Sequence, residues 1–179
     1  MEMAIAKPSN AMPFLTAPAC QSSGLPGAEA GFDPLYLSDF IDIKWMREAE
    51  LKHGRICMLA VVGWLTVDAG IHFPGEKYTG IDALHAHDAM LASGNMGVML
   101  LFAAVAELTS MVSVVQAAKG SGREAGDFGL DPLEFCGNPD TKKFMLEAET
   151  THARLAMLGF SGLCTQSALL ESHTFPYLS

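Results

Sequence analysis

Three stretches of the sequence have the length and apolar character of membrane-spanning helices. The first runs from about residue 43 to 67, and its last 12 residues carry no charge. The second, residues 96–115, has 20 residues with Glu107 as its one charge, which matches the length that crosses a bilayer core. The third runs from about residue 141 to 170, and its last 16 residues are free of charge. The pattern predicts an all-α membrane protein with three transmembrane helices.

The remaining segments set the expected boundaries. Residues 1–42 are rich in Pro, Gly, Ala and Ser and show no sustained period, so we expect an extended N-terminal arm. The helical domain then covers residues 43–171, with a loop over residues 72–82, and residues 172–179 form a C-terminal tail. Ten of the eleven Lys and Arg residues fall on one side of the three spans. The positive-inside rule therefore places the N-terminus on the cytoplasm-equivalent side.

The composition excludes several function classes. Hydrophobic residues make up 50% of the chain and charged residues 17%, whereas a soluble domain has about 25% charged residues. Too little polar surface remains for an ordinary soluble enzyme. The net charge of −9 comes without a basic patch, which excludes nucleic acid as a partner. The composition indicates a membrane protein or one that buries bulky apolar ligands.

An internal repeat relates the first and third helices at a shift of 99 residues. Residues 46–59 align with residues 145–158, and Glu, Glu, His, Arg, Met and Leu coincide. An Asp-Pro-Leu turn precedes each copy, at residues 33–35 and 131–133, with a shift of 98. Two copies in the same orientation predict that the first and third helices cross and are related by a pseudo-two-fold axis along the membrane normal.

Helix geometry separates the Glu and Arg of one copy. At about 100° per residue, Arg55 lies about 140° around the helix from Glu50, and Arg154 is placed likewise relative to Glu149. Charges near a bilayer core need partners inside the bundle. We therefore expect reciprocal ion pairs, Arg55 with Glu149 and Arg154 with Glu50. Small residues are expected where the two helices approach each other, namely Ala60, Gly63, Gly159 and Gly162.

The two Glu-x-x-His motifs, Glu50 with His53 and Glu149 with His152, admit three interpretations. They are ion-pair locks with two incidental histidines, or half of a di-iron carboxylate site, or axial ligands to the magnesium of a porphyrin-like pigment. A di-iron site needs a Glu from each of two further helices, and here Glu107 is the one available. The pigment interpretation fits best, because Mg²⁺ accepts imidazole or a neutralised carboxylate and the macrocycle accounts for the apolar excess.

The doubled Glu-x-x-His-x-Arg-x-x-Met-Leu motif, each copy following an Asp-Pro-Leu turn, resembles the chlorophyll-binding light-harvesting antenna superfamily of plastids. The resemblance covers residues 11–166 and implies chlorophylls on three thylakoid helices, with carotenoids in the grooves of the crossed pair. It implies that the axial ligands to chlorophyll magnesium are Glu50, His53, Glu107, Glu149, His152 and Gln166. It also makes Arg55 and Arg154 the ion-pair locks, and it places carotenoid ends at Asp33, Pro34, Asp131 and Pro132.

Some positions depart from the family pattern. Met99 stands eight residues before Glu107, where the family commonly has Gln. A thioether is a poor Mg²⁺ ligand, so this pigment is absent, is ligated by water, or is held by Asn95. His152 replaces the Asn that is usual in green plants and is a competent ligand. His173 is a further candidate ligand, although a loop histidine is the more common explanation.

The segment Ala11–Leu15 and the short loop between the first two helices resemble red-lineage algal members. Such members bind chlorophyll a, with chlorophyll c in many cases, and carotenoids of the fucoxanthin, peridinin or diadinoxanthin type. Red-algal photosystem I antennae, which lack chlorophyll c, are also similar.

The resemblance implies a non-enzymatic antenna of the plastid thylakoid membrane with a stromal N-terminus. Its expected partners are a photosystem core (photosystem I is favoured), neighbouring antenna subunits and thylakoid lipids. A photoprotective, quenching member of the same superfamily is the alternative. The acids of the lumenal side that favour it are Asp68, Glu76, Asp82 and Asp88.

Overall fold

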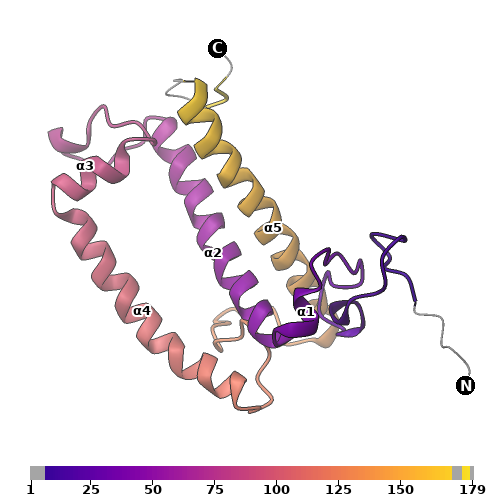
Figure 1. Ribbon diagram of the computed structural model, residues 1–179. Helices are drawn as coiled ribbons and strands as arrows, with labels where there is room; N and C mark the ends of the chain where they lie inside the picture. Colours follow the sequence, from indigo (N-terminus) through magenta and orange to yellow (C-terminus); the bar gives the residue numbers. More distant parts are fainter. Residues whose placement is uncertain (1–6, 171–174, 178–179) are drawn as a thin grey trace, which may run out of the picture. The chain divides into compact units, whose positions relative to one another are not determined.

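Three long helices dominate the computed structural model, which describes residues 7–170 and 175–177 (Figure 1). They are α2 (Ile43–Asp68), α4 (Asn95–Ala118) and α5 (Pro139–Leu170). Each begins and ends within three residues of the range that the apolar pattern predicts for a transmembrane helix. His173 and most of the expected tail lie outside the described residues.

Four short elements complete the described chain: η1 (Ala19–Ser22), α1 (Leu37–Phe40), η2 (Glu76–Tyr78) and α3 (Ala86–Ala92). The sequence does not predict α3, because its seven residues carry no apolar stripe of helical period.

The chain divides into two compact units, and both contain part of α2 and part of α5. Unit 1 consists of residues 1–52 and 114–152, and unit 2 consists of residues 53–113 and 153–179.

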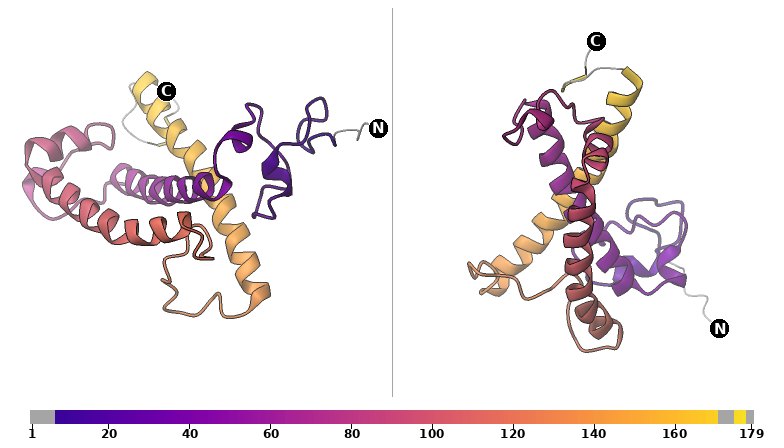
Figure 2. Two further views of the ribbon diagram at one scale, coloured as in Figure 1. Left: turned by 60° about the horizontal axis from the view of Figure 1, so that its bottom comes forward. Right: turned by 90° about the vertical axis from the view of Figure 1, so that its left-hand side faces the viewer.

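The N-terminal segment of unit 1 folds back on itself, which corrects the expectation of an extended arm (Figure 2). The Ser9 hydroxyl donates to the Gly31 carbonyl at 2.7 Å, and the Ala11 amide donates to the Ala30 carbonyl at 2.7 Å. Residues 8 and 16 form an antiparallel bridge. The turns needed for this path use glycines with positive φ, including Gly24, Gly27 and Gly31. The Pro and Gly content therefore marks turns that return the chain, rather than an open arm.

The two Asp-Pro-Leu turns of unit 1 have the same geometry. The Asp33 carboxylate accepts the amides of Leu37 at 3.0 Å and Ser38 at 2.9 Å. The Asp131 carboxylate accepts the amides of residues 135 and 136 at 3.1 and 2.8 Å. The fourth residue of each turn, Tyr36 or Glu134, has a φ of 53°. The repeat seen in the sequence thus extends to the backbone conformation and to the side-chain cap.

In unit 2, α2 and α5 are in tight contact at Gly54. A Cβ built on Gly54 would lie 2.2 Å from the Cβ of Ala153, and Ala153 is 1% exposed. The predicted approach at Gly63, Gly159 and Gly162 is wrong, because a Cβ on any of these glycines meets no atom within 4 Å. The two helices therefore touch at equivalent positions of the repeat, Gly54 and Ala153, and diverge before the later glycines.

The end of α2 is tied to Tyr177, which follows α5 in the chain, within unit 2. The Trp64 indole donates to the Tyr177 hydroxyl, which in turn donates to the Asp68 carboxylate. The Trp64 ring also meets Phe160 of α5 edge to face, with centroids 5.8 Å apart. Burial and the bond to Asp68 raise the pKa of Tyr177 above its ordinary value of 10.0. These contacts fasten the chain beyond α5 to the last turns of α2.

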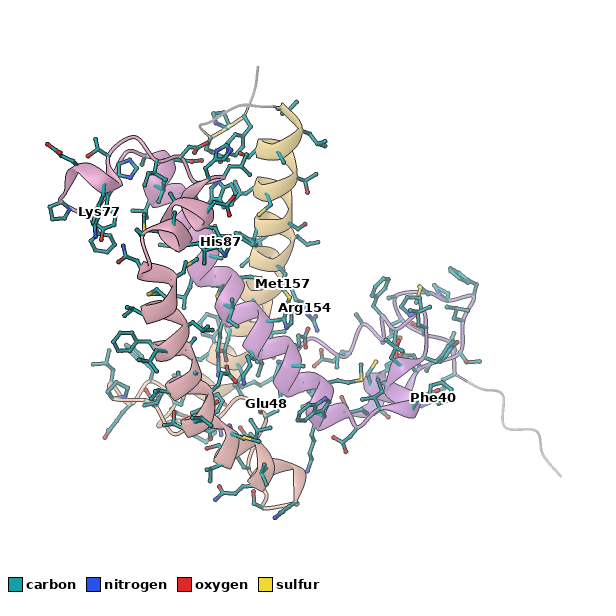
Figure 3. All side chains as sticks on the ribbon, turned by 60° about the vertical axis from the view of Figure 1, so that its left-hand side comes forward. Phe40, Glu48, Lys77, His87, Arg154 and Met157 are labelled. Carbon is teal, nitrogen blue, oxygen red and sulfur yellow. The ribbon has the colours of Figure 1, made fainter. Side chains whose placement is uncertain are left out.

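Most apolar side chains of the described residues face outward. The buried apolar residues there are Leu51, Ala153, Ala156, Leu163 and Tyr177. On α4, side chains around the whole helix are exposed (Figure 3), including Leu100 at 71% and Phe102 at 68%. Such an apolar exterior is incompatible with water as the solvent on all sides.

One described segment, residues 95–116 of α4, is long and apolar enough by itself to cross a membrane. The first halves of α2 and α5 carry several charged residues, so these helices do not contain an equally long apolar stretch, although their second halves are apolar. The structure therefore supports a helical membrane protein, and three spans stay a prediction.

Substituting Gly54 by alanine should destabilise the fold. The new methyl group would overlap Ala153, and overpacking of this kind costs about 1–3 kcal/mol. Thermal denaturation followed by far-ultraviolet circular dichroism should show a lower midpoint for Gly54→Ala. Gly63→Ala on the same helix is the control, since its methyl group enters open space. Equal midpoints for Gly54→Ala and the wild type would contradict the close approach.

The cap of the first Asp-Pro-Leu turn should depend on pH. Burial opposes the charged form of Asp33, but hydrogen bonds from Ser38 and Leu37 outweigh it and hold the pKa below its ordinary value of 3.8. Because the pKa is lowered in the folded state, the stabilisation is present above 3.8 and is lost as the pH falls through the folded value. Amide hydrogen exchange of Leu37 and Ser38, corrected for intrinsic rates, should lose protection over that range.

The Asp33→Asn variant is the control for this titration. Its neutral amide should give weak protection that no longer varies with pH. A wild-type profile in Asp33→Asn would show that the carboxylate does not hold the turn.

Candidate functional site

His152 has the geometry of a metal ligand on α5. Its side chain is exposed, and its Nδ1 lies 2.7 Å from the carbonyl oxygen of Ala148. Because a carbonyl only accepts, Nδ1 carries the proton and Nε2 presents its lone pair outward. A second hydrogen bond of this kind commonly orients ligating histidines. His53, the equivalent residue on α2, is also exposed.

Glu50 makes an ion pair that the sequence interpretation missed. Arg47, three residues earlier on α2, donates from Nη1 to Glu50 Oε2 at 2.7 Å. The i,i+3 spacing was the available signal, but Arg47 has no counterpart in the repeat, where Leu146 stands at the equivalent position. Glu149 is half-buried on α5.

The reciprocal ion pairs of Arg55 with Glu149 and of Arg154 with Glu50 stay predictions. Arg55 is half-buried on α2, and Arg154 is exposed on α5 (Figure 3).

The middle-helix candidates lie along α4. Glu107 and Met99 are exposed, with Met99 at 63%. Asn95, at the first position of α4, donates from Nδ2 to the Tyr78 hydroxyl at 3.1 Å. The Oδ1 atom of this amide is an acceptor and is the atom that a cation would meet. Gln166 is exposed near the end of α5.

The residues predicted to lie near carotenoid ends have two different roles. The carboxylates of Asp33 and Asp131 hold their own turns through backbone amides. Pro34 and Pro132 are exposed, as are the leucines that follow them, Leu35 at 72% and Leu133 at 71%. An apolar ligand would therefore meet the Pro-Leu surface, which the Asp residue positions.

A buried carboxylate, Glu48, anchors the loop that follows α4. It is 7% exposed and accepts the Gly126 amide at 2.7 Å, with Arg123 Nη1 at 3.5 Å. Arg123 also lies over the Phe128 ring, 4.7 Å from its centroid. In the other copy, Glu147 is exposed and lies 3.9 Å from Lys143. The sequence alignment pairs Glu48 with Glu147. The structure distinguishes them, because Glu48 is buried and anchors the loop while Glu147 lies on the surface.

A di-iron centre would need several acidic and imidazole groups gathered together. Among the described residues, no three His, Cys, Asp or Glu side chains are arranged to hold a metal ion. The candidate donors belong to three different helices, α2, α4 and α5. This distribution suits ligands that each bring their own metal, with the protein supplying one axial donor apiece.

The residues present fit magnesium-containing pigments. Each such pigment needs one oxygen or nitrogen donor and a large apolar contact surface. His152 offers an oriented nitrogen, and apolar side chains on the same helices are exposed. The open space beside Gly63, Gly159 and Gly162 leaves room for a flat group against the backbone.

Comparisons with known proteins agree with this arrangement. The family model described as chlorophyll A-B binding protein matches residues 21–169. A fucoxanthin-chlorophyll a-c binding protein of Isochrysis galbana is 31% identical over 161 residues, covering 82% of this chain and 77% of that protein. A stress-related light-harvesting protein of Chlamydomonas reinhardtii (3.2) is 27% identical over 88% of this chain and 68% of its own length.

A chlorophyll a-b binding protein of Prasiola crispa is 33% identical over 171 residues, covering 85% of this chain. The chain spans about half of that relative, 53% of its length. The resemblance drawn from the repeated motif is confirmed. The names of these relatives place those proteins in the chloroplast. The chain belongs to the chlorophyll A-B binding protein family of light-harvesting membrane proteins.

Proposed function

We propose that the protein is an antenna subunit that binds chlorophylls and carotenoids and transfers excitation energy to a photosystem core. The observation that carries the proposal is the coincidence of exposed magnesium-type donors with exposed apolar helix surface, clearest at His152. Bound pigment would absorb light and pass on the excitation. The chain's own work is to fix the position and orientation of each pigment on rigid helices.

The proposed axial donors are those of the family motif: Glu50, His53, Glu107, Glu149, His152 and Gln166. Asn95 is the proposed alternative to Met99 on α4, since its Oδ1 is the better donor to Mg²⁺. Arg55 and Arg154 neutralise Glu149 and Glu50 in this proposal.

The proposed membrane topology has three spans, with α2 and α5 crossed about a pseudo-two-fold axis and the N-terminus in the stroma. Two observations support the pseudo-symmetry. The Asp-Pro-Leu turns share one geometry, and a tight contact joins the equivalent residues Gly54 and Ala153. The pigment-binding domain in this proposal is residues 43–171.

The proposed cofactors are chlorophyll a with chlorophyll c and xanthophylls of the fucoxanthin, peridinin or diadinoxanthin type. The name of the Isochrysis galbana relative supports the first of these types. Photosystem I, neighbouring antenna subunits and thylakoid lipids are the proposed partners.

A quenching role is the second candidate function. It is favoured by the stress-related relatives and by ionisable pairs in the loop between α2 and α4. In that loop His85 Nδ1 lies 2.9 Å from Asp82, and His87 Nδ1 lies 3.1 Å from Asp88. Each of these contacts is an ion pair only when its histidine is protonated.

Replacing His53 by leucine should remove one chlorophyll per polypeptide, because leucine offers no axial donor. The same loss is expected for His152→Leu. Pigments extracted from the purified complex and quantified by chromatography measure the loss, and metal analysis of the same sample should find magnesium rather than iron. His87→Leu, a substitution in the short helix α3, is the matched control. Unchanged chlorophyll content in both His53→Leu and His152→Leu would contradict the ligand assignment.

The fluorescence lifetime of the purified complex separates the antenna role from the quenching role. An antenna should keep the same chlorophyll lifetime at neutral pH and at about pH 5, since its pigment contacts do not depend on the loop histidines. Marked shortening on acidification that is lost in a combined His85→Gln and His87→Gln variant would favour the quencher.

A further inference from the structure

We propose that Arg47 is a positioning residue for Glu50 and makes this pigment site different from its repeat equivalent at Glu149. The inference rests on the proposed function, in which Glu50 is an axial ligand. It concerns a residue that lies outside the duplicated motif and has no counterpart in the second copy.

Arg47 is held in one orientation by α5. Its side chain is 5% exposed, and its Nη2 donates to the hydroxyl of Thr150, which is 2% exposed. The Thr150 hydroxyl donates in turn to the carbonyl of Leu146 at 2.8 Å. Because the hydroxyl proton is directed to that carbonyl, the oxygen lone pair faces Arg47. The guanidinium is therefore fixed by the second helix before it meets Glu50.

The orientation of Arg47 selects one oxygen of Glu50. Nη1 donates to Oε2 at 2.7 Å, while Nη2 is engaged by Thr150. Glu50 is 28% exposed, so its carboxylate reaches the helix surface from a partly buried base. With Oε2 held by a guanidinium that is itself fixed by Thr150, the position of the Glu50 carboxylate is set relative to α5. The rigid fork of arginine suits such positioning better than a flexible ammonium.

The same contact supplies charge. A cation 2.7 Å from a partly buried carboxylate neutralises much of its field, which is the state that a neutral magnesium macrocycle needs in its ligand. In the proposed lock Arg154 adds a second cation at Glu50, whereas the second copy has the uncharged Leu146 at the position equivalent to Arg47.

The second copy of the repeat has neither an arginine equivalent to Arg47 nor a threonine equivalent to Thr150. At the shift of 99 residues, Leu146 stands in place of Arg47, and Leu51 stands in place of Thr150. Leu51 and Thr150 are both 2% exposed, so the position is buried in each copy while its chemistry differs. The two carboxylate sites therefore share a motif but carry different local charge, and a bound pigment would have a different transition energy at each.

The test compares Arg47→Leu, the residue found in the second copy, with Arg47→Lys and Thr150→Val. Chlorophyll per polypeptide is measured by pigment extraction, and the red absorption and circular dichroism bands are recorded. Arg47→Leu should lose up to one chlorophyll and shift or remove one band. Arg47→Lys, which keeps the positive charge but lacks the planar guanidinium group, should retain an intermediate amount of chlorophyll. Lys44→Leu, an exposed cation on the same helix, should behave as the wild type.

Thr150→Val tests the positioning step, because it removes the bond that orients Arg47 but leaves the pair of Arg47 with Glu50. It should retain an intermediate amount of chlorophyll and shift the band that Arg47→Leu loses. Wild-type pigment content and spectrum in Thr150→Val would show that this bond does not position Arg47 and would overturn the inference. Wild-type pigment content and spectrum in both Arg47 variants would overturn it as well.

Glu50→Leu distinguishes failure of this inference from failure of the proposed function. If Glu50→Leu loses one chlorophyll and Arg47→Leu loses none, only the role of Arg47 is wrong. If Glu50→Leu keeps the full complement, the ligand assignment fails and the inference falls with it.

Discussion

The close contact of Gly54 with Ala153 is the constraint on which the rest of the arrangement depends. A glycine at this point lets two helix backbones approach without a side chain between them, which is how helices associate where no hydrophobic force drives them together. The contact is small, and beyond it Gly63 and Gly159 border open space. A tight contact of this size fixes two long helices and leaves most of their surface available to other molecules. Few apolar residues of the described chain are buried, so the proposed pigments would complete the hydrophobic core.

In unit 1, hydrogen bonds and ion pairs add to the small number of buried apolar contacts. Glu48 joins the first turns of α2 to the loop at Gly126, and Arg47 joins the same turns to Thr150 of α5. Buried charges that are fully hydrogen-bonded add little net stability, but removing one partner leaves an uncompensated charge that costs several kcal/mol. These bonds therefore act chiefly on geometry, since they penalise any arrangement in which the helix ends move apart. The rigidity that pigment spacing requires comes from such bonds rather than from the volume of the packed core.

The sequence predicts the regular parts of this molecule because their causes are local. Apolar runs bounded by charges and glycines set the ends of α2, α4 and α5, and the repeat at a shift of 99 residues points to the residues proposed as donors. It does not predict α3, whose seven residues have no period, or the fold of the N-terminal segment, whose bonds such as Ser9 to Gly31 join residues far apart in the chain. The sequence pattern predicts the helix contact at Gly63, nine residues after the contact at Gly54. Small residues permit a close approach but do not determine where the helices meet. The role of Arg47 depends on Thr150, 103 residues later, which no local pattern reveals.

Duplication explains why symmetric and asymmetric features occur side by side. The Asp-Pro-Leu turns have kept the same cap and the same φ of 53° at their fourth residue, because both must start a chain segment that leads into a donor-bearing helix. The flanking positions are under no such shared requirement, so Glu48 has become a buried anchor while Glu147 is a surface residue. Identical pigment sites would have nearly identical transition energies, whereas a directed flow of excitation needs sites that differ. In the proposed assignment, divergence at positions such as 47 and 146 would supply that difference without altering the donors themselves, so the duplicated motif would preserve binding while its surroundings set the energy.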